Sequence, residues 1–171
     1  TNSVTTPDTQ GTTQFVCGGW MMTGNDPTTG TTNWFVVTLT NDAVLTWLWN
    51  TNYWLDTGAG PNGSVNAGDG WQSFGATTSI TATADAYYHF TNRTGDAGGS
   101  ANPLDLLMDA PKSVTANFAE NLAPFGTPEW WLASYGLTNL SFEMEAVCDT
   151  DQDGLCAWEE HVADTDPTNE A

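Results

Sequence analysis

Basic residues are almost absent from this sequence, which has two, Arg93 and Lys112, against 21 acidic residues and a formal net charge of −19. Binding to nucleic acid or to an anionic membrane surface requires Lys and Arg to neutralise phosphate groups. The charge balance therefore excludes both kinds of partner. Long apolar runs are missing as well. None approaches the ~20 residues of a membrane span, so we expect no membrane insertion.

Cysteine and histidine are scarce. The chain has three cysteines and two histidines, and it contains no Cys-x-x-Cys motif. A zinc site or a Cys/His catalytic pair is therefore not expected. Cys148 and Cys156 bracket a short acidic loop, where a disulfide would close that loop in an oxidising compartment and leave Cys17 unpaired. Three free thiols are the alternative.

Thr, Gly and aromatic residues are abundant instead. The sequence has 28 Thr, 17 Gly and nine Trp among its 171 residues, and only 13% of its residues are charged. So many aromatic side chains and so few charges argue against a disordered chain. The composition is typical of a β-rich protein that is secreted or exposed at a cell surface. The length predicts one globular domain, or one domain with a small appendage.

Hydrophobic patterning divides the chain into three parts. Residues 1–14 are polar and Thr-rich and are expected to form an extended N-terminal arm or an edge strand. Residues 15–120 alternate β-branched and aromatic runs with Gly, Asn, Asp and Pro, which predicts a β domain. Within it the pattern predicts a loop at 58–63 and strands over 34–40, 43–49, 53–55, 79–84, 87–90, 104–108 and 113–118.

A weak internal repeat runs through this β domain. Residues 44–49 and 113–118 align at an offset of 69. The alignment predicts two small β units, about 15–57 and 79–120, that pack into one domain because neither can bury its own apolar face. Chance similarity between two β-rich segments is the alternative.

Residues 121–171 have a different character. A linker with two prolines leads to a predicted helix, with Thr127 as its N-cap, Pro128 at its first position and Gly136 at its end. The last 31 residues, from Ser141 on, carry ten of the 21 acids and neither Lys nor Arg.

One motif in this tail points to specific chemistry. Residues 149–160 fit the pattern D-x-[DN]-x-[DN]-G-x5-E of an EF-hand calcium loop. Ca²⁺ takes about six to eight oxygen ligands, and alternate carboxylates can converge on it while a glycine, here Gly154, permits the sharp turn. The predicted ligands are the side chains of Asp149, Asp151, Asp153 and Glu160 and the backbone carbonyl of Leu155. An acidic helix start without a metal is the alternative.

Three neighbouring acids are less certain members of the site. Glu159 competes with Glu160 for the last ligand position. A helix is predicted over 157–163, and Asp164 and Asp166 follow it. These two aspartates either complete the metal shell, form half of a second site shared with a neighbouring molecule, or belong to an ordinary Asx/Pro turn.

Two parts of the sequence resemble known families. The run from Gly126 to Leu137, followed by residues 149–160 and by Ala163-Asp164-Thr165-Asp166-Pro167, looks like the calcium-binding tails of secreted bacterial proteins. It is similar to type 3 thrombospondin repeats and dockerin half-sites over about residues 126–169. This resemblance implies the same five ligands. Gln152 stands where the pattern often has Gly.

Residues 79–118 resemble an internalin B-type (listerial–bacteroidal) β repeat. The likeness rests on the segments Tyr88-His89-Phe90, Gly95-Asp96 and Asn102-Pro103-Leu104, although the usual Trp before Gly-Asp is replaced around Arg93-Thr94. The family implies a small β-grasp-like fold and an adhesive or structural role outside the cell. The expected fold is thus mostly β, a β-sandwich or tandem β-grasp-like repeats, with a small C-terminal helical calcium-loop appendage.

These observations predict a secreted, calcium-binding structural protein of the cell surface. It would be a self-assembling subunit of a fibre or surface layer, hence a homo-oligomer or polymer joined through residues 1–14, or an adhesive module. A calcium-dependent carbohydrate-binding module that recognises surface glycans is the alternative, with Trp20, Trp34, Trp54 and Trp71 as stacking candidates. An enzyme is not expected, because the acids outside the tail are scattered and neither Gly-x-Ser-x-Gly nor His-Glu-x-x-His occurs.

Overall fold

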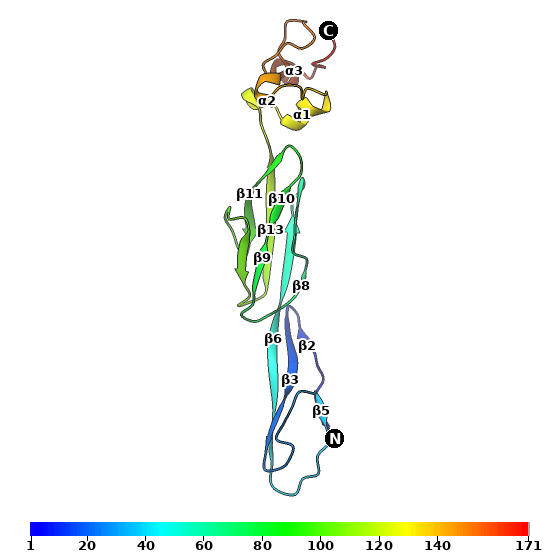
Figure 1. The fold of residues 1–171 in the computed structure, drawn as a ribbon, viewed down its shortest axis with the longest axis vertical. Coiled ribbons are helices and arrows are strands. Elements are labelled where there is room, and N and C mark those ends of the chain that lie inside the picture. Colours follow the sequence, from blue (N-terminus) through cyan, green and yellow to red (C-terminus); the bar gives the residue numbers. More distant parts are fainter. Residues whose placement is uncertain (171) are drawn as a thin grey trace.

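The computed structural model describes residues 1–170 and is elongated, with the N-terminus towards one end and a helical tail at the other (Figure 1). The strands are β1 (Asn2–Ser3), β2 (Asp8–Gln10), β3 (Thr13–Thr23), β4 (Thr29–Gly30), β5 (Trp34–Phe35), β6 (Val44–Ala59), β7 (Gly63–Val65), β8 (Gly70–Ser73), β9 (Thr77–Ile80), β10 (Ala82–Ala84), β11 (Tyr88–Gly95), β12 (Leu104–Leu107) and β13 (Lys112–Glu120). The helices are the 3-10 turn η1 (Pro124–Gly126), α1 (Glu129–Ser134), α2 (Phe142–Glu145) and α3 (Ala157–Ala163).

Seven strands form one mixed sheet in the order β11-β13-β6-β3-β2, with β4 attached to β3 and β8 attached to β6. The other strands make three two-stranded sheets, β1–β5, β7–β10 and β9–β12. The predicted mostly β fold class is confirmed. Strands β1 and β2 lie in the segment predicted as an extended arm or an edge strand; β1 pairs with β5, and β2 pairs with β3 at the end of the mixed sheet.

Strand β6 is the long strand that connects two parts of the sheet. Its first ten residues pair antiparallel with β3, and its last five pair in parallel with β13. The same strand therefore belongs to an N-terminal unit (residues 1–52) and to a central unit (residues 53–120). Sequence analysis predicted two separate strands with a loop at 58–63 here, because Asn50, Asn52 and Gly58 look like turn residues. They are instead paired within the sheet, Asn50 with β3, Asn52 with both β3 and β8, and Gly58 with β13.

Each β unit has its own core. In the N-terminal unit the buried residues are Trp20, Met22 and Phe35, and the Trp20 and Phe35 rings stack with centroids 3.9 Å apart. The Trp20 indole lies so close to Gly30 that a Cβ there would meet it at 2.6 Å. The central unit buries five larger side chains: Leu55, Ile80, Leu106, Met108 and Val114.

One strand predicted from the sequence is wrong in the N-terminal unit. A strand was predicted over 34–40, but pairing stops after Phe35. Phe35 and Val37 turn inward onto the small core, while Val36 is 64% exposed. Alternation of apolar side chains is thus present without a strand, because the segment only covers one face of the β3–β6 hairpin.

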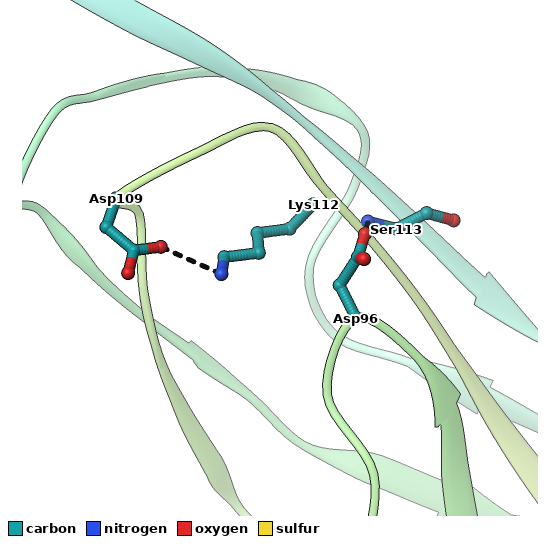
Figure 2. A network of polar contacts seen from close by, with 4 residues as sticks. All are labelled: Asp96, Asp109, Lys112 and Ser113. Atoms are coloured by element: carbon teal, nitrogen blue, oxygen red, sulfur yellow. Dashed lines mark hydrogen bonds and ion pairs between the residues drawn. The ribbon is translucent and has the colours of Figure 1, made fainter.

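The two basic side chains of the sequence, Arg93 and Lys112, both have interaction partners within the fold. Arg93 is 3% exposed, and its guanidinium donates hydrogen bonds to the carbonyls of Ala101 and Ile80 and to the Asn102 side chain. Its guanidinium carbon also lies 4.7 Å from the centre of the Phe90 ring. Lys112 forms an ion pair of 2.8 Å with Asp109 (Figure 2). Among residues 1–170, neither Arg93 nor Lys112 therefore offers solvent an unpaired charge.

The tail packs its short helices around a small core of Ala123, Leu132, Leu137, Ala146 and Ala157. The predicted end of the first helix at Gly136 is matched by a positive φ of 75° there. The predicted N-cap is displaced by one residue, since Pro128 occupies that position and the Thr127 hydroxyl donates to the Pro124 carbonyl at 3.1 Å instead. No helix among residues 1–170 is long and apolar enough to cross a membrane.

Candidate metal centre

The acidic loop is closed by backbone pairing at its base. The Ala157 N–H donates to the Cys148 carbonyl at 3.0 Å, and the Trp158 N–H donates to the Ala146 carbonyl at 2.9 Å. Ala146 and Ala157 are fully buried, so the start of α3 is held against the end of α2. These contacts bring residue 149 and residue 160 to the same end of the tail.

Three of the predicted ligands converge within this loop. Carboxylate oxygens of Asp149, Asp151 and Asp153 all lie within 4.8 Å of one another. The chain curls around them because Gln152 and Gly154 adopt positive φ values of 68° and 100°. Asp149 accepts hydrogen bonds from the backbone N–H groups of both these residues, at 2.7 and 3.1 Å.

The fourth carboxylate is buried next to this group. Glu160 is 1% exposed; its Oε1 accepts a long hydrogen bond of 3.5 Å from Thr165, and its Oε2 has no partner. Oδ2 of Asp151 is also buried without a partner. Burial, followed by the charges of Asp151 and Asp153, raises the pKa of Glu160 above its ordinary value. A buried carboxylate left unpaired beside other carboxylates is costly unless a cation neutralises it.

The structure separates the two glutamates that the sequence left in competition. The Glu159 carboxylate accepts the Cys156 backbone N–H at 2.9 Å and so caps the start of α3. Glu160 alone is buried with a free oxygen. Leu155, whose carbonyl is the remaining predicted ligand, donates its N–H to Asp153 at 2.8 Å and keeps a side chain that is 38% exposed.

The two aspartates after α3 form a turn. Asp164 ends the helix in the left-handed conformation, with φ 59°. Asp166 accepts hydrogen bonds from the Thr168 N–H and hydroxyl at 3.0 and 2.7 Å, and Pro167 is buried. This is the geometry of the Asx/Pro turn. It leaves Asp166 close enough to Glu160 to contribute to the raised pKa of that group.

The disulfide favoured from the sequence is not formed, since Cys17, Cys148 and Cys156 are all free thiols. The loop is closed by the backbone hydrogen bonds at its base, without a covalent bridge. Burial, then the charges of Glu159 and Asp149, raises the pKa of Cys156, so its thiol is held in the protonated form.

Contacts between the tail and the central unit were not foreseen. Asn121 joins the two parts: its Oδ1 accepts a hydrogen bond from Nδ1 of His89 at 2.9 Å, and its side-chain amide donates to Glu129 at 3.1 Å. The Trp130 ring nitrogen donates to Glu120 at 2.7 Å. The spacing of these residues follows no motif, so no sequence signal identifies them. They link the end of β13 to the first turn of α1.

A separate hollow lies beside Trp54 in the central unit. It has a volume of about 330 Å³, and its lining includes Asp56, Asp96 and Lys112. Its polar groups are engaged with one another: Ser113 donates its N–H to Asp96 at 2.7 Å and its hydroxyl to Asp56 at 2.8 Å, and Figure 2 shows Asp96 facing Ser113 beside Lys112. Of the four residues predicted to stack on sugars, Trp34 is exposed (55%). The prediction is wrong for Trp20, because its side chain is buried.

Comparison with known proteins identifies one part of the chain. Residues 53–122 match the family model of the divergent InlB B-repeat domain. Domains of this kind occur in surface-exposed bacterial proteins, so the match indicates a cell-surface module. The matched segment begins at Tyr53 in the middle of β6, well before the first residue of the predicted resemblance, Ser79. No curated protein and no solved structure matches the chain.

Proposed function

We propose that this protein is a non-catalytic, calcium-stabilised structural module of the bacterial cell surface. The observation that carries the proposal is the buried, unpartnered oxygen of Glu160 beside the three converging aspartates. The match of residues 53–122 to a repeat of surface proteins supports the location.

Calcium is the ion that this set of donors favours. Hard oxygen ligands are typical of Ca²⁺ and Mg²⁺, whereas Zn²⁺ and Cu²⁺ prefer nitrogen and sulfur. A flexible loop with several carboxylates favours the larger ion, because Mg²⁺ demands near-ideal octahedral geometry. Asp149, Asp151, Asp153 and Glu160 would bind through their side chains and Leu155 through its carbonyl, with water at the position of Ala157.

The expected effect of calcium is to stabilise the tail. The ion neutralises carboxylates that repel one another, and it binds only when residues 149 and 160 are held together. A ligand specific for the folded state at about 100 times its dissociation constant stabilises that state by about 2.7 kcal/mol. The central unit carries no such cluster among the described residues, so its stability should not depend on calcium.

The elongated shape fits a structural role. Strand β6 runs through both β units as one continuous element, and the tail extends the molecule further (Figure 1). Such a molecule suits a subunit of an extracellular fibre or layer, or a module that displays an adhesive surface. With a net charge of −19 and its two cations engaged, it is not suited to nucleic acid.

Titration calorimetry with Ca²⁺ and with Mg²⁺ tests the proposal. We expect one Ca²⁺ site, weaker binding of Mg²⁺, and a loss of at least about tenfold in Ca²⁺ affinity for Glu160→Gln. The matched control is Glu143→Gln in α2, which removes the same charge from the tail outside the loop. Equal loss in both variants, or no heat of binding in the wild type, would contradict the proposal.

The hollow beside Trp54 supports a second candidate, carbohydrate binding. An aromatic side chain next to carboxylates and hydroxyls is a common arrangement for sugars, since one face stacks while the edges accept hydrogen bonds. Here, however, Asp56 and Asp96 already accept hydrogen bonds from Ser113. A glycan array without binding to the wild type would remove this candidate. Binding abolished by Trp54→Ala but retained in Trp130→Ala would establish it.

A further inference from the structure

One long edge of the sheet is left without a strand. Strand β6 is paired with β3 along its first ten residues, and its opposite edge carries β8 only from Leu55 back to Asn52. The last backbone hydrogen bond on that opposite edge joins the Phe74 N–H to the Thr51 carbonyl at 2.8 Å. Within the described residues 1–170, the backbone of residues 44–50 pairs with β3 alone. We call this open side of residues 44–50 the free edge.

The free edge lacks the features that protect natural sheet edges. Exposed edges are normally guarded by Lys, Pro, inward charges or bulges, because they offer unpaired N–H and C=O groups to another chain. Residues 43–55 contain no charged residue and no proline. The one bulge of this hairpin lies on β3, between Cys17 and Gly19, and leaves the free edge regular.

Three apolar side chains along this edge are open to solvent, together with the polar Thr46 and Asn50. Val44 is 66% exposed, Leu48 41% and Trp49 42%, and Met21 on the neighbouring strand is 53% exposed. Where β8 ends, a hollow of about 280 Å³ opens between Trp49 and Phe74. Phe74 itself is 63% exposed. An incoming strand would therefore find backbone partners, exposed apolar side chains and a recess at the end of its path.

The distribution of acidic residues indicates which surface can approach another copy of the chain without charge repulsion. Residues 1–55 carry three acids, Asp8, Asp26 and Asp42, whereas the remaining eighteen acids lie in residues 56–171. Contact between two copies through the central unit or the tail brings together surfaces of the same sign. Contact through the free edge does not, because its residues are neutral.

We propose that the free edge is a self-association site, where residues 44–50 of one molecule pair antiparallel with residues 44–50 of a second copy. Seven residues match the usual length of a strand. Pairing centred on Trp47 places Val44 of the second copy opposite Asn50, next to the hollow at Phe74. The two β3–β6 hairpins then form one continuous sheet, and both tails remain at the outer ends. This inference deepens the assembly part of the proposed function, and it does not require calcium.

Sedimentation velocity of the 171-residue chain over a range of concentrations tests this site. We expect a reversible dimer that persists in chelator and strengthens as salt is raised, since salt screens repulsion between the acidic parts. Leu48→Glu should raise the dissociation constant by about tenfold to a hundredfold, because it replaces an apolar contact and brings two like charges diagonally across the new pair, each opposite Thr46 of the other copy. Leu107→Glu, the same change at a side chain that is 51% exposed on β12, should leave it unchanged.

Hydrogen exchange gives a second readout that needs no variant. Amides of residues 44–50 should become more protected as the wild-type concentration rises, while those of β11 and β12 should not. A monomer at every concentration and salt would overturn the proposal, as would a dimer equally weakened by both substitutions. Calorimetric Ca²⁺ binding by the same samples separates the outcomes, since a dimer without calcium binding would contradict only the proposed metal function.

Discussion

The central unit and the tail each bury a charged side chain, and they satisfy it differently. Arg93 in the central unit is surrounded by carbonyl and amide oxygens of the chain itself, at 2.8 and 3.1 Å for two of its contacts. Glu160 in the tail has one long contact and a free oxygen, and its nearest charges are of its own sign. Nε of Arg93 also lacks a partner, but the unpartnered oxygen of Glu160 lies beside three converging aspartates, an arrangement that could hold a cation.

The hydrophobic cores of the central unit and the tail also differ, in the size of the side chains that they bury. The central core contains Leu55, Ile80 and Met108, all at most 1% exposed. The tail core consists mainly of alanines, with Leu132 and Leu137 as its only larger buried members among the described residues. Alanine buries little apolar area, so the tail gains less from packing than the central unit does.

The largest effect is expected from Leu55→Ala, which empties the centre of the β core. Removing a buried Leu costs about 3 kcal/mol, through lost burial and the cavity left behind. The loss in free energy of unfolding should be the same in calcium and in chelator. Chemical denaturation in both conditions measures it, with Leu107→Ala as the exposed control. A loss that depends on calcium would break the distinction between the two regions.

Removal of calcium should have the next largest effect, confined to the tail. At saturating calcium the tail should gain about 2.7 kcal/mol for a concentration about 100 times the dissociation constant. Glu160→Gln should abolish this gain, while Glu143→Gln should retain it. Thermal unfolding with and without chelator provides the measurement. Persistence of the full gain in Glu160→Gln would show that the ion binds elsewhere.

Arg93→Lys is expected to destabilise the central unit by about 2 kcal/mol. Lysine keeps the charge, but one ammonium group cannot reach the carbonyls of both Ala101 and Ile80 as the planar guanidinium does. Urea denaturation checks the value. The tail should still bind calcium with unchanged affinity, which calorimetry on the same variant can establish. A neutral effect would mean that the buried cation does not hold this unit together.

The smallest predicted effect is the pH dependence of the tail in chelator. The pKa of Glu160 is raised in the folded state, so its contribution to stability is fully present below the ordinary pKa of about 4.5 and is lost as pH rises through the folded pKa. The melting temperature of the tail should therefore fall with rising pH, and it should fall more steeply in the wild type than in Glu160→Gln. Parallel curves would contradict the assignment.

The sequence predicted the elements whose information is local. Helix α3, Ala157–Ala163, has the predicted bounds, and the acids of the loop converge as their spacing indicates. Each depends on residues a few positions apart, where turn preference and helix capping decide the structure. Gly154 and Gly136 are examples, because a positive φ is needed at both.

Features that depend on distant residues were missed. The length of β6 cannot be read from residues 50–58, since their pairing partners on β8 and β13 lie far along the chain. The burial of Glu160 depends on how α3 packs in the tail, which the local sequence does not show. The burial of Trp20 likewise follows from its stacking on Phe35, fifteen positions later. Long-range packing decides these cases.

Hydrogen exchange of the whole chain, in millimolar calcium and in excess chelator, tests most directly whether only the tail depends on the ion. We predict that amides of residues 146–163 lose protection in chelator, whereas those of β6 and β13 keep theirs. Protection that is equal in both conditions throughout the tail would contradict the account, because the buried carboxylate of Glu160 would then be stable without a cation.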